Sequence, residues 1–89
     1  MKAVVTVIGK DTVGILAKVS AVCSEHNANI VEVTQSVLQN MFAMIMLVEM
    51  PDVSDGLGFL SDRMKELGKQ NNLQIHVIHE DIFNTMHKI

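Results

Sequence analysis

The segment Met41–Val48 carries an apolar residue at every position, and this constrains the fold more than any other feature of the chain. Successive side chains of an extended strand point to opposite faces, so both faces of this strand are apolar. One face carries Phe42, Met44, Met46 and Val48, and the other carries Met41, Ala43, Ile45 and Leu47. The segment Ala3–Ile8 is similar, with Val4, Thr6 and Ile8 opposite Ala3, Val5 and Val7. A sheet that contains both strands therefore has two apolar faces that need a cover.

Strand patterns and helical patterns alternate along the chain, and six elements are predicted. The two helices show apolar stripes with helical spacing, at Ile15, Leu16, Val19, Val22 and Cys23 and at Leu57, Leu60, Met64 and Leu67. The predicted elements are a strand over Ala3–Ile8, a helix from Val13 to about His26, strands over Asn29–Leu38 and Met41–Met50, a helix that Gly68 and Asn71-Asn72 stop, and a strand over Leu73–His79. The order β-α-β-β-α-β predicts an α+β, ferredoxin-like fold, in which a four-stranded antiparallel sheet carries both helices on one face.

Local signals mark the ends of these elements. Thr12 can accept a hydrogen bond from the first turn of the first helix, and Asn27 tolerates the left-handed conformation that ends it. Gln39-Asn40 is predicted to form a tight hairpin turn, although it lacks the usual glycine. We expect the start of the second helix to be satisfied by a group of acidic and hydroxyl side chains, Asp52, Ser54 and Asp55.

The strand Asn29–Leu38 is expected to alternate, with Val31, Val33 and Val37 on one face and Glu32, Thr34 and Ser36 on the other. The tail Glu80–Ile89 follows the last strand, and Ile82, Phe83 and Met86 are spaced for one more helical turn. No linker or repeat divides the chain, so residues 1–89 are expected to form one domain with a short C-terminal tail, 80–89.

The face of the sheet without helices is the main functional signal from the apolar pattern. A contiguous apolar patch of this size is unusual on a monomer, so we expect a homodimer or a higher homo-oligomer. The alternatives are that the tail folds back over this face with Phe83 and Met86, or that the face docks on another protein. If the face docks on another protein, Met44 and Met46 are candidate contact residues, because methionine side chains adapt to varied partner surfaces.

Composition excludes several function classes. The 89 residues include 7 basic and 10 acidic ones, a net charge of −3, and only 3% are aromatic, which argues against nucleic-acid binding. No apolar run approaches the roughly 20 residues of a membrane helix, and the start of the chain does not resemble a signal peptide. A single cysteine, Cys23, fits a reduced, cytoplasmic protein.

No arrangement of residues predicts catalysis, a metal site or a cofactor. His76 and His79 are three apart on a strand and point to opposite faces, so they cannot chelate one ion together. Cys23 lies on an apolar helical stripe, where a buried, inert thiol is expected. Nothing places a nucleophile beside a base, so the chain is not expected to be an enzyme.

The loop between the first strand and the first helix is the remaining candidate site. Gly9 and Gly14 flank it and allow close approach of a ligand to the backbone. The free N–H groups of the helix N-terminus favour a carboxylate, and Asp11 could meet an ammonium group, so the loop suits a free amino acid. An ordinary helix cap at Asp11-Thr12 explains the same residues without a ligand.

The segment Lys10-Asp11-Thr12-Val13-Gly14-Ile15-Leu16, followed by Asn27-Ala28-Asn29-Ile30, resembles the ACT domain family. The pattern D-x-x-G-I-L and the N-I step that opens the second strand carry the resemblance, and helix and strand spacing agree over about residues 1–79. ACT domains are regulatory modules of ferredoxin-like fold that bind amino acids. The chain looks like the stand-alone bacterial ACT proteins, a group of uncharacterised function, and it is also similar to one half of the glycine cleavage system repressor.

The resemblance implies a small-molecule ligand, an amino acid, held between two ACT units, with a possible regulated protein partner. It places Asp11, Thr12, Val13, Gly14 and Ile15 of the loop and Asn29 and Ile30 of the second strand at the ligand. Val13 stands where the family often has proline, which leaves this loop less rigid. Some ACT units bind no ligand and serve only to associate, which leaves a ligand-free interaction module as the alternative function.

Overall fold

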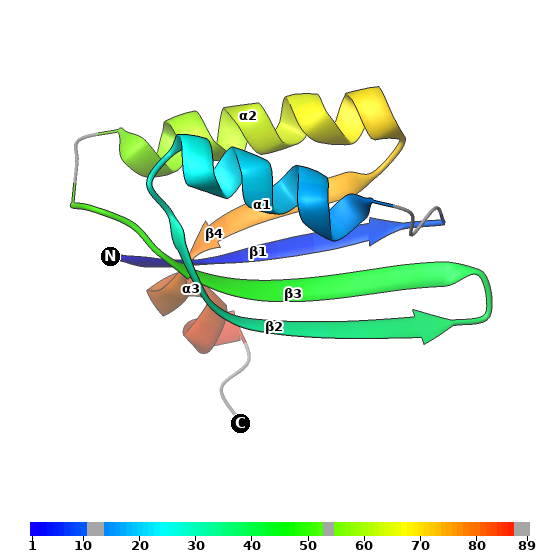
Figure 1. The fold of residues 1–89 in the computed structure, drawn as a ribbon. Coiled ribbons are helices and arrows are strands. Elements are labelled where there is room, and N and C mark those ends of the chain that lie inside the picture. Colours follow the sequence, from blue (N-terminus) through cyan, green and yellow to red (C-terminus); the bar gives the residue numbers. More distant parts are fainter. Residues whose placement is uncertain (11–13, 53–54, 87–89) are drawn as a thin grey trace.

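The fold is a four-stranded antiparallel sheet with two helices on one face and a short helix on the other (Figure 1). The computed structural model describes residues 1–10, 14–52 and 55–86. Its elements are β1 (Lys2–Gly9), α1 (Ile15–Glu25), β2 (Asn29–Leu38), β3 (Met41–Glu49), α2 (Gly56–Asn71), β4 (Gln74–His79) and α3 (Glu80–Met86). The strand order is β2-β3-β1-β4, so β3 and β1 are central and β2 and β4 form the edges. The predicted ferredoxin-like, α+β fold is confirmed.

The core lies between the sheet and the helices α1 and α2. One face of each central strand is buried there, and it consists of Ala3, Val5, Val7, Phe42, Met44, Met46 and Val48. The apolar stripes of the helices meet this face, with Ile15, Val19, Val22 and Cys23 from α1 and Leu60, Met64 and Leu67 from α2. Met44 and Met46 are therefore core residues, and the hypothesis that they contact a partner is wrong.

The alternation predicted for β2 is interrupted near its start. Ile30 pairs with Val48 and Glu32 pairs with Leu47, so Val31 is an extra residue in a β-bulge. Ile30 and Val33 then lie opposite Val48 and Met46, on the helix side of the sheet, although they are three residues apart. Beyond the bulge the predicted alternation is confirmed, with Thr34 and Ser36 opposite Ile45 and Ala43 on the other side.

The turns agree with the sequence signals better than the helix starts do. Asn27 and Gln39 are in the left-handed conformation at the predicted helix end and hairpin turn, with φ of 56° and 57°. By contrast, α1 begins at Ile15 after Gly14, and α2 begins at Gly56 after Asp55, and neither Gly14 nor Asp55 provides a side-chain cap. Thr12 and Ser54 lie outside the described residues. Asp52 contributes elsewhere, because its carboxylate lies 3.2 Å from the ammonium group of Met1.

The sequence predicted that Gly68 and Asn71-Asn72 stop the second helix, and only the second part is confirmed. The helix α2 continues past Gly68 to Asn71, and Asn72 after it is left-handed with a φ of 59°. Gly68 is instead the point where α2 packs most closely on the chain leading into β4. A Cβ atom at Gly68 would lie 2.6 Å from the carbonyl oxygen of Leu73. The helix therefore requires glycine here for packing rather than for termination.

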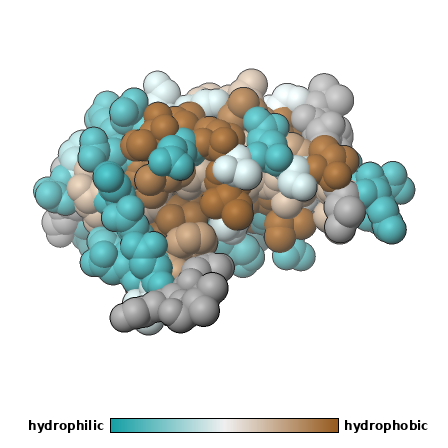
Figure 2. Space-filling model, turned by 90° about the horizontal axis from the view of Figure 1, so that it is seen from below, coloured by the Kyte–Doolittle hydropathy of each residue, from teal (hydrophilic) through white to brown (hydrophobic). Residues whose placement is uncertain are grey.

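The second face of the sheet, which we call the open face, lacks α1 and α2. Register places rows of side chains on it, and one row runs from Glu32 through Leu47 and Val4 to Ile78. The predicted helical turn in the tail is confirmed as α3, which lies beneath this face at the start of β1 (Figure 1). Val4 is only 4% exposed, whereas the apolar side chains of Ile8, Met41 and Ile45 on the same face are more than 40% exposed. Figure 2 shows hydrophobic side chains gathered across this face among polar ones.

Candidate ligand-binding site

The loop residues predicted to bind a ligand are only partly described by the structure. Asp11, Thr12 and Val13 lie outside the described residues. Gly14 is exposed and has a φ of 73°, a left-handed conformation that most side chains avoid. Ile15 is buried in the core, so its side chain holds α1 on the sheet and only its backbone borders the loop.

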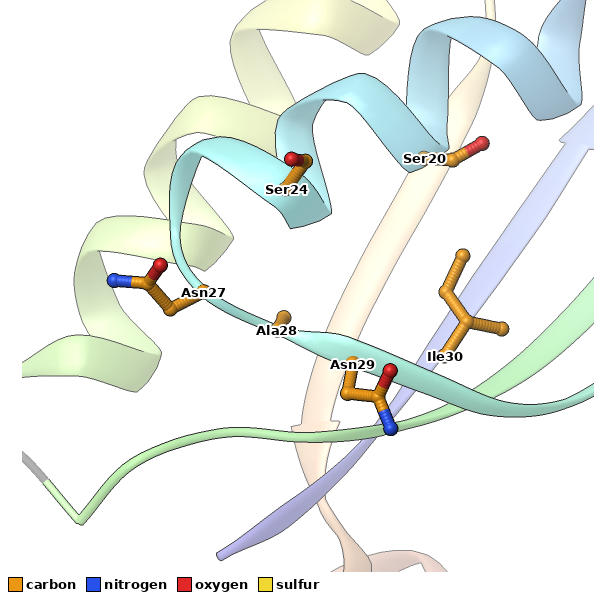
Figure 3. A pocket seen from close by; sticks show the side chains of 6 residues that line it. All are labelled: Ser20, Ser24, Asn27, Ala28, Asn29 and Ile30. Atoms are coloured by element: carbon orange, nitrogen blue, oxygen red, sulfur yellow. The ribbon is translucent and has the colours of Figure 1, made fainter.

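The other predicted residues, Asn29 and Ile30, line a hollow between the end of α1 and the start of β2 (Figure 3). Asn29 is exposed, and Ile30 is half-buried against the core. The rest of the lining is Ser20, Ser24, Asn27 and Ala28. Hydroxyl and amide groups dominate the rim, and none of the described lining residues is charged.

Sequence reasoning did not single out Ser20, Ser24 and Asn27 as site residues. Figure 3 shows the two serines on successive turns of α1, beside the Asn27–Ile30 segment that leads into β2. Ser20 donates its hydroxyl proton to the carbonyl oxygen of Leu16, and the backbone N–H of Asn27 donates to the Ser24 carbonyl oxygen at 3.1 Å. The i, i+4 spacing of two serines on the polar side of α1 was the signal that could have found them.

The two parts of the predicted site do not meet within one chain. Gly14 precedes α1, whereas Asn29 and Ile30 follow it at the start of β2, so the two parts lie at opposite ends of the helix. An 11-residue helix is about 16 Å long. A ligand the size of an amino acid therefore cannot touch both parts in a single copy of the chain.

A second hollow lies beside the described end of the loop. Its polar lining is Lys10, Asn71, Asn72 and Gln74, next to Ile8, Gly9 and Met41. The Nζ atom of Lys18 donates to Oδ1 of Asn71 at 2.7 Å, and Nδ2 of Asn71 donates to the Leu67 carbonyl oxygen at 2.9 Å, so this amide is already held. Lys10 places a positive charge next to the loop.

The other reactive side chains do not form a site. Cys23 is buried, and this burial raises the pKa of its thiol, so it stays protonated at neutral pH. Register puts His76 opposite Thr6 and His79 opposite Ala3, on different faces of the sheet as predicted. Within residues 1–10, 14–52 and 55–86, no group of three or more His, Cys, Asp or Glu side chains could hold a metal ion.

Residues 2–78 match a family model described as the ACT domain. A UPF0237 protein of Clostridium perfringens is 44% identical over 89 residues, which is the whole of both chains. A UPF0237 protein of Methanopyrus kandleri is 42% identical over 88 residues, 99% of this chain and 98% of its own. Full-length relatives therefore occur in both a clostridium and a methanogen.

Solved structures share the fold. An ACT domain protein from Streptococcus pneumoniae superposes with a TM-score of 0.83 at 35% identity and covers 93% of both chains. A structure described as a glycine cleavage system transcriptional repressor gives a TM-score of 0.72 at 22% identity, covering 85% of this chain and 43% of its own. Among the described residues, no helix is both long and apolar enough to cross a membrane.

Proposed function

We propose a function from the premise that this chain belongs to the ACT domain family, whose model matches residues 2–78. The chain is a regulatory module of that family. In our proposal it binds a small molecule, an amino acid, at the interface of a homodimer, and the occupancy of the site biases a protein partner. Such a bias requires that the ligand favour one state of the assembly over the other.

The exposed edge of β2 supports the dimer. Among the described residues no strand covers this edge, and Val31, Val33 and Val37 on it are exposed, Val37 by 64%. Proteins usually protect a long edge strand with lysine or proline, and β2 contains neither. The bulge at Val31 disturbs only its first residues. A second β2, paired antiparallel about a two-fold axis, would satisfy the free backbone groups.

The separation of the two half-sites along α1 is the observation that carries the proposal. Antiparallel pairing of two β2 strands directs the start of one strand towards the end of the other. The hollow at the start of the partner copy's β2 would then lie near the end of this chain's β2, on the side of the molecule where Gly14 precedes α1. Two copies would thus supply both parts of a site that one copy cannot form, and the two-fold axis would create it twice.

The chemistry on the two sides suits a free amino acid. The start of α1 presents unpaired N–H groups and Lys10 lies beside the loop, so a carboxylate is favoured there. The opposing hollow offers amide and hydroxyl oxygens that accept hydrogen bonds from an ammonium group. Asp11 is proposed to add the negative charge. We propose no catalytic role, because the one thiol is buried and protonated, and we place the module in the cytoplasm.

Sedimentation and ligand-dependent melting test the proposal together. The chain has neither Trp nor Tyr, so a dye should report unfolding while each common amino acid is added. A ligand at a hundred times its Kd stabilises by about 2.7 kcal/mol. We expect Val33→Lys to give monomers that bind no amino acid, and His76→Lys, at an exposed position of the other edge strand β4, to keep both properties. Asn29→Ala and Asp11→Ala should each lose the ligand and stay dimeric.

Amino-acid binding by a monomer, or a dimer that survives Val33→Lys with its ligand bound, would contradict the proposal. A flat response to all amino acids would favour the second candidate function, a ligand-free interaction module. The exposed Ile8, Met41 and Ile45 of the open face favour that candidate. Its test is Ile45→Lys, which should abolish association while Val33→Lys leaves it intact.

A further inference from the structure

The C-terminal helix α3 forms one wall of a hollow on the open face. The floor consists of Val4, Ile45 and Leu47, from the two central strands. On one side rise Glu32 and Thr34 of β2, and on the other rise Glu80, Phe83 and Asn84 of α3. The volume is about 200 Å³, which equals roughly six or seven water molecules.

Strand register explains why this hollow is apolar at the bottom and acidic at its sides. Glu32 pairs with Leu47, and Leu47 pairs with Val4, so these three side chains stand in one row across three strands. Adjacent strands lie about 4.8 Å apart, which places the backbone of Glu32 nearly 10 Å from that of Val4. Glu80 begins α3 directly after β4, beyond Val4 in the same direction. The apolar floor therefore lies between two carboxylates.

The charge of the hollow is not balanced by its own lining. Among the residues that the structure describes, no lysine, arginine or histidine contributes to it. In the part of the chain that the structure describes, neither Glu32 nor Glu80 is within ion-pair distance of a cation. Lys2 lies two residues before Val4 on the same face, where register sets it opposite Glu49. A cationic group is therefore the complementary occupant.

This hollow is distinct from the site proposed for an amino acid. The ACT family model ends at residue 78, and α3 begins at Glu80. The UPF0237 relative of Clostridium perfringens aligns over all 89 residues, so the wall that α3 supplies belongs to a segment shared by full-length relatives but outside the domain model.

We propose that the hollow beneath α3 binds a short aliphatic ammonium compound. Its hydrocarbon chain packs on Val4, Ile45, Leu47 and the ring of Phe83, and the negative charges of Glu32 and Glu80 on either side attract its ammonium group. The oxygens of Thr34 and Asn84 accept the remaining hydrogen bonds. A free amino acid fits poorly, because its carboxylate would approach two negative charges.

Amide chemical shifts of the full chain, recorded during a titration with n-butylammonium, measure binding in the hollow directly. Butyrate has the same chain length and the opposite charge, and ammonium chloride has the charge without the chain. We expect saturable shifts at Val4, Thr34, Leu47 and Asn84 with n-butylammonium only. Glu32→Gln and Glu80→Gln should each weaken binding, by up to about tenfold, because each removes a negative charge that attracts the ammonium group. Glu66→Gln on α2 should leave it unchanged.

Equal binding of butyrate, equal binding of ammonium chloride, or full binding by both Gln variants would overturn the proposal. Since Glu32 is exposed and Glu80 is half-buried, both variants should fold, and their unperturbed amide spectra would verify this. Shifts at Gly14 and Asn29 instead of the hollow would assign the probe to the amino-acid site. The proposal does not depend on dimerisation, so Val33→Lys should bind n-butylammonium as the unmodified chain does.

Discussion

Ile45 and Met46 are neighbours in β3, yet they lie in opposite environments. Met46 is fully buried between the sheet and the two long helices, whereas Ile45 is 45% exposed on the open face. The two faces of the strand have nearly the same hydrophobicity in the sequence, and the difference arises because α1 and α2 both pack on one side. Hydrophobicity at a single position of a central strand therefore does not indicate whether the residue forms the core or an interface.

The largest effect should come from placing a charge on each face in turn. Met46→Lys buries an unpaired ammonium group, at a cost of about 5 kcal/mol, which is comparable with the whole stability of a small domain. Ile45→Lys should change the stability of the monomer by less than about 1 kcal/mol. Urea unfolding followed by circular dichroism measures both. Equal destabilisation by the two changes would mean that the open face is also a core.

Close packing on the helix side predicts a smaller effect at Gly68. Gly68→Ala puts a methyl group against the carbonyl oxygen of Leu73 and should cost about 2 kcal/mol. Gly58→Ala, in the same helix but with open space around it, should stabilise by about 0.5–1 kcal/mol. Thermal melts of both variants test this contrast, and a stable Gly68→Ala would show that α2 can move away from β4.

Because α3 covers part of the open face, removing its half-buried ring should lower the free energy of unfolding by about 1 kcal/mol. Phe83→Ala removes a half-buried ring beside Val4, whereas Ile82→Ala removes a side chain that is 55% exposed and should have little effect. Hydrogen exchange at the Val4 amide and urea unfolding would report the difference. Equal effects of the two variants would mean that α3 does not hold this end of the face.

The smallest effect should appear at alkaline pH and involves Cys23 on the helix side. Its pKa in the folded protein is raised from 9.0 by burial, so the unfolded chain loses the thiol proton first. The stabilising contribution is complete below pH 9 and declines above it, by at most about 1.4 kcal/mol per pH unit, until the folded thiol also ionises. Urea unfolding at pH 8 and pH 10 should show a steeper loss for the unmodified chain than for Cys23→Ala. Identical losses would contradict the burial of the thiol.

Most of the fold could be predicted from the sequence because it follows from local periodicity. Helical stripes, β-branched runs and the turn at Gln39 identify their elements without reference to distant contacts. The roles of Met44 and Gly68 could not be predicted, because each depends on which element packs against that position. A glycine near the end of a helical pattern can either end the helix or allow close packing, and at Gly68 the approach of the Leu73 backbone decides between the two.

The candidate site was less predictable than the fold. Asn29 lies in the hollow at the start of β2, as the resemblance implied, whereas Ser20 and Ser24 became candidates only when α1 was placed beside β2. Asp11, Thr12 and Val13 stay predictions, since the structure does not describe them. If a site is formed by two copies, the sequence of one chain shows only two groups of residues that are too far apart to bind one ligand.

The extra residue in β2 also determines where the chain can change length. Without Val31, Ile30 and Glu32 would still pair with Val48 and Leu47, and every later residue of the strand would keep its face. A deletion after the bulge, for instance at Gln35, would shift the residues before it by one position relative to the hairpin. Their side chains would then point to the opposite face of the sheet. Homologues that are one residue shorter in β2 should therefore lack the residue at position 31, and an alignment that places their gap elsewhere assigns valines to the wrong side of the sheet.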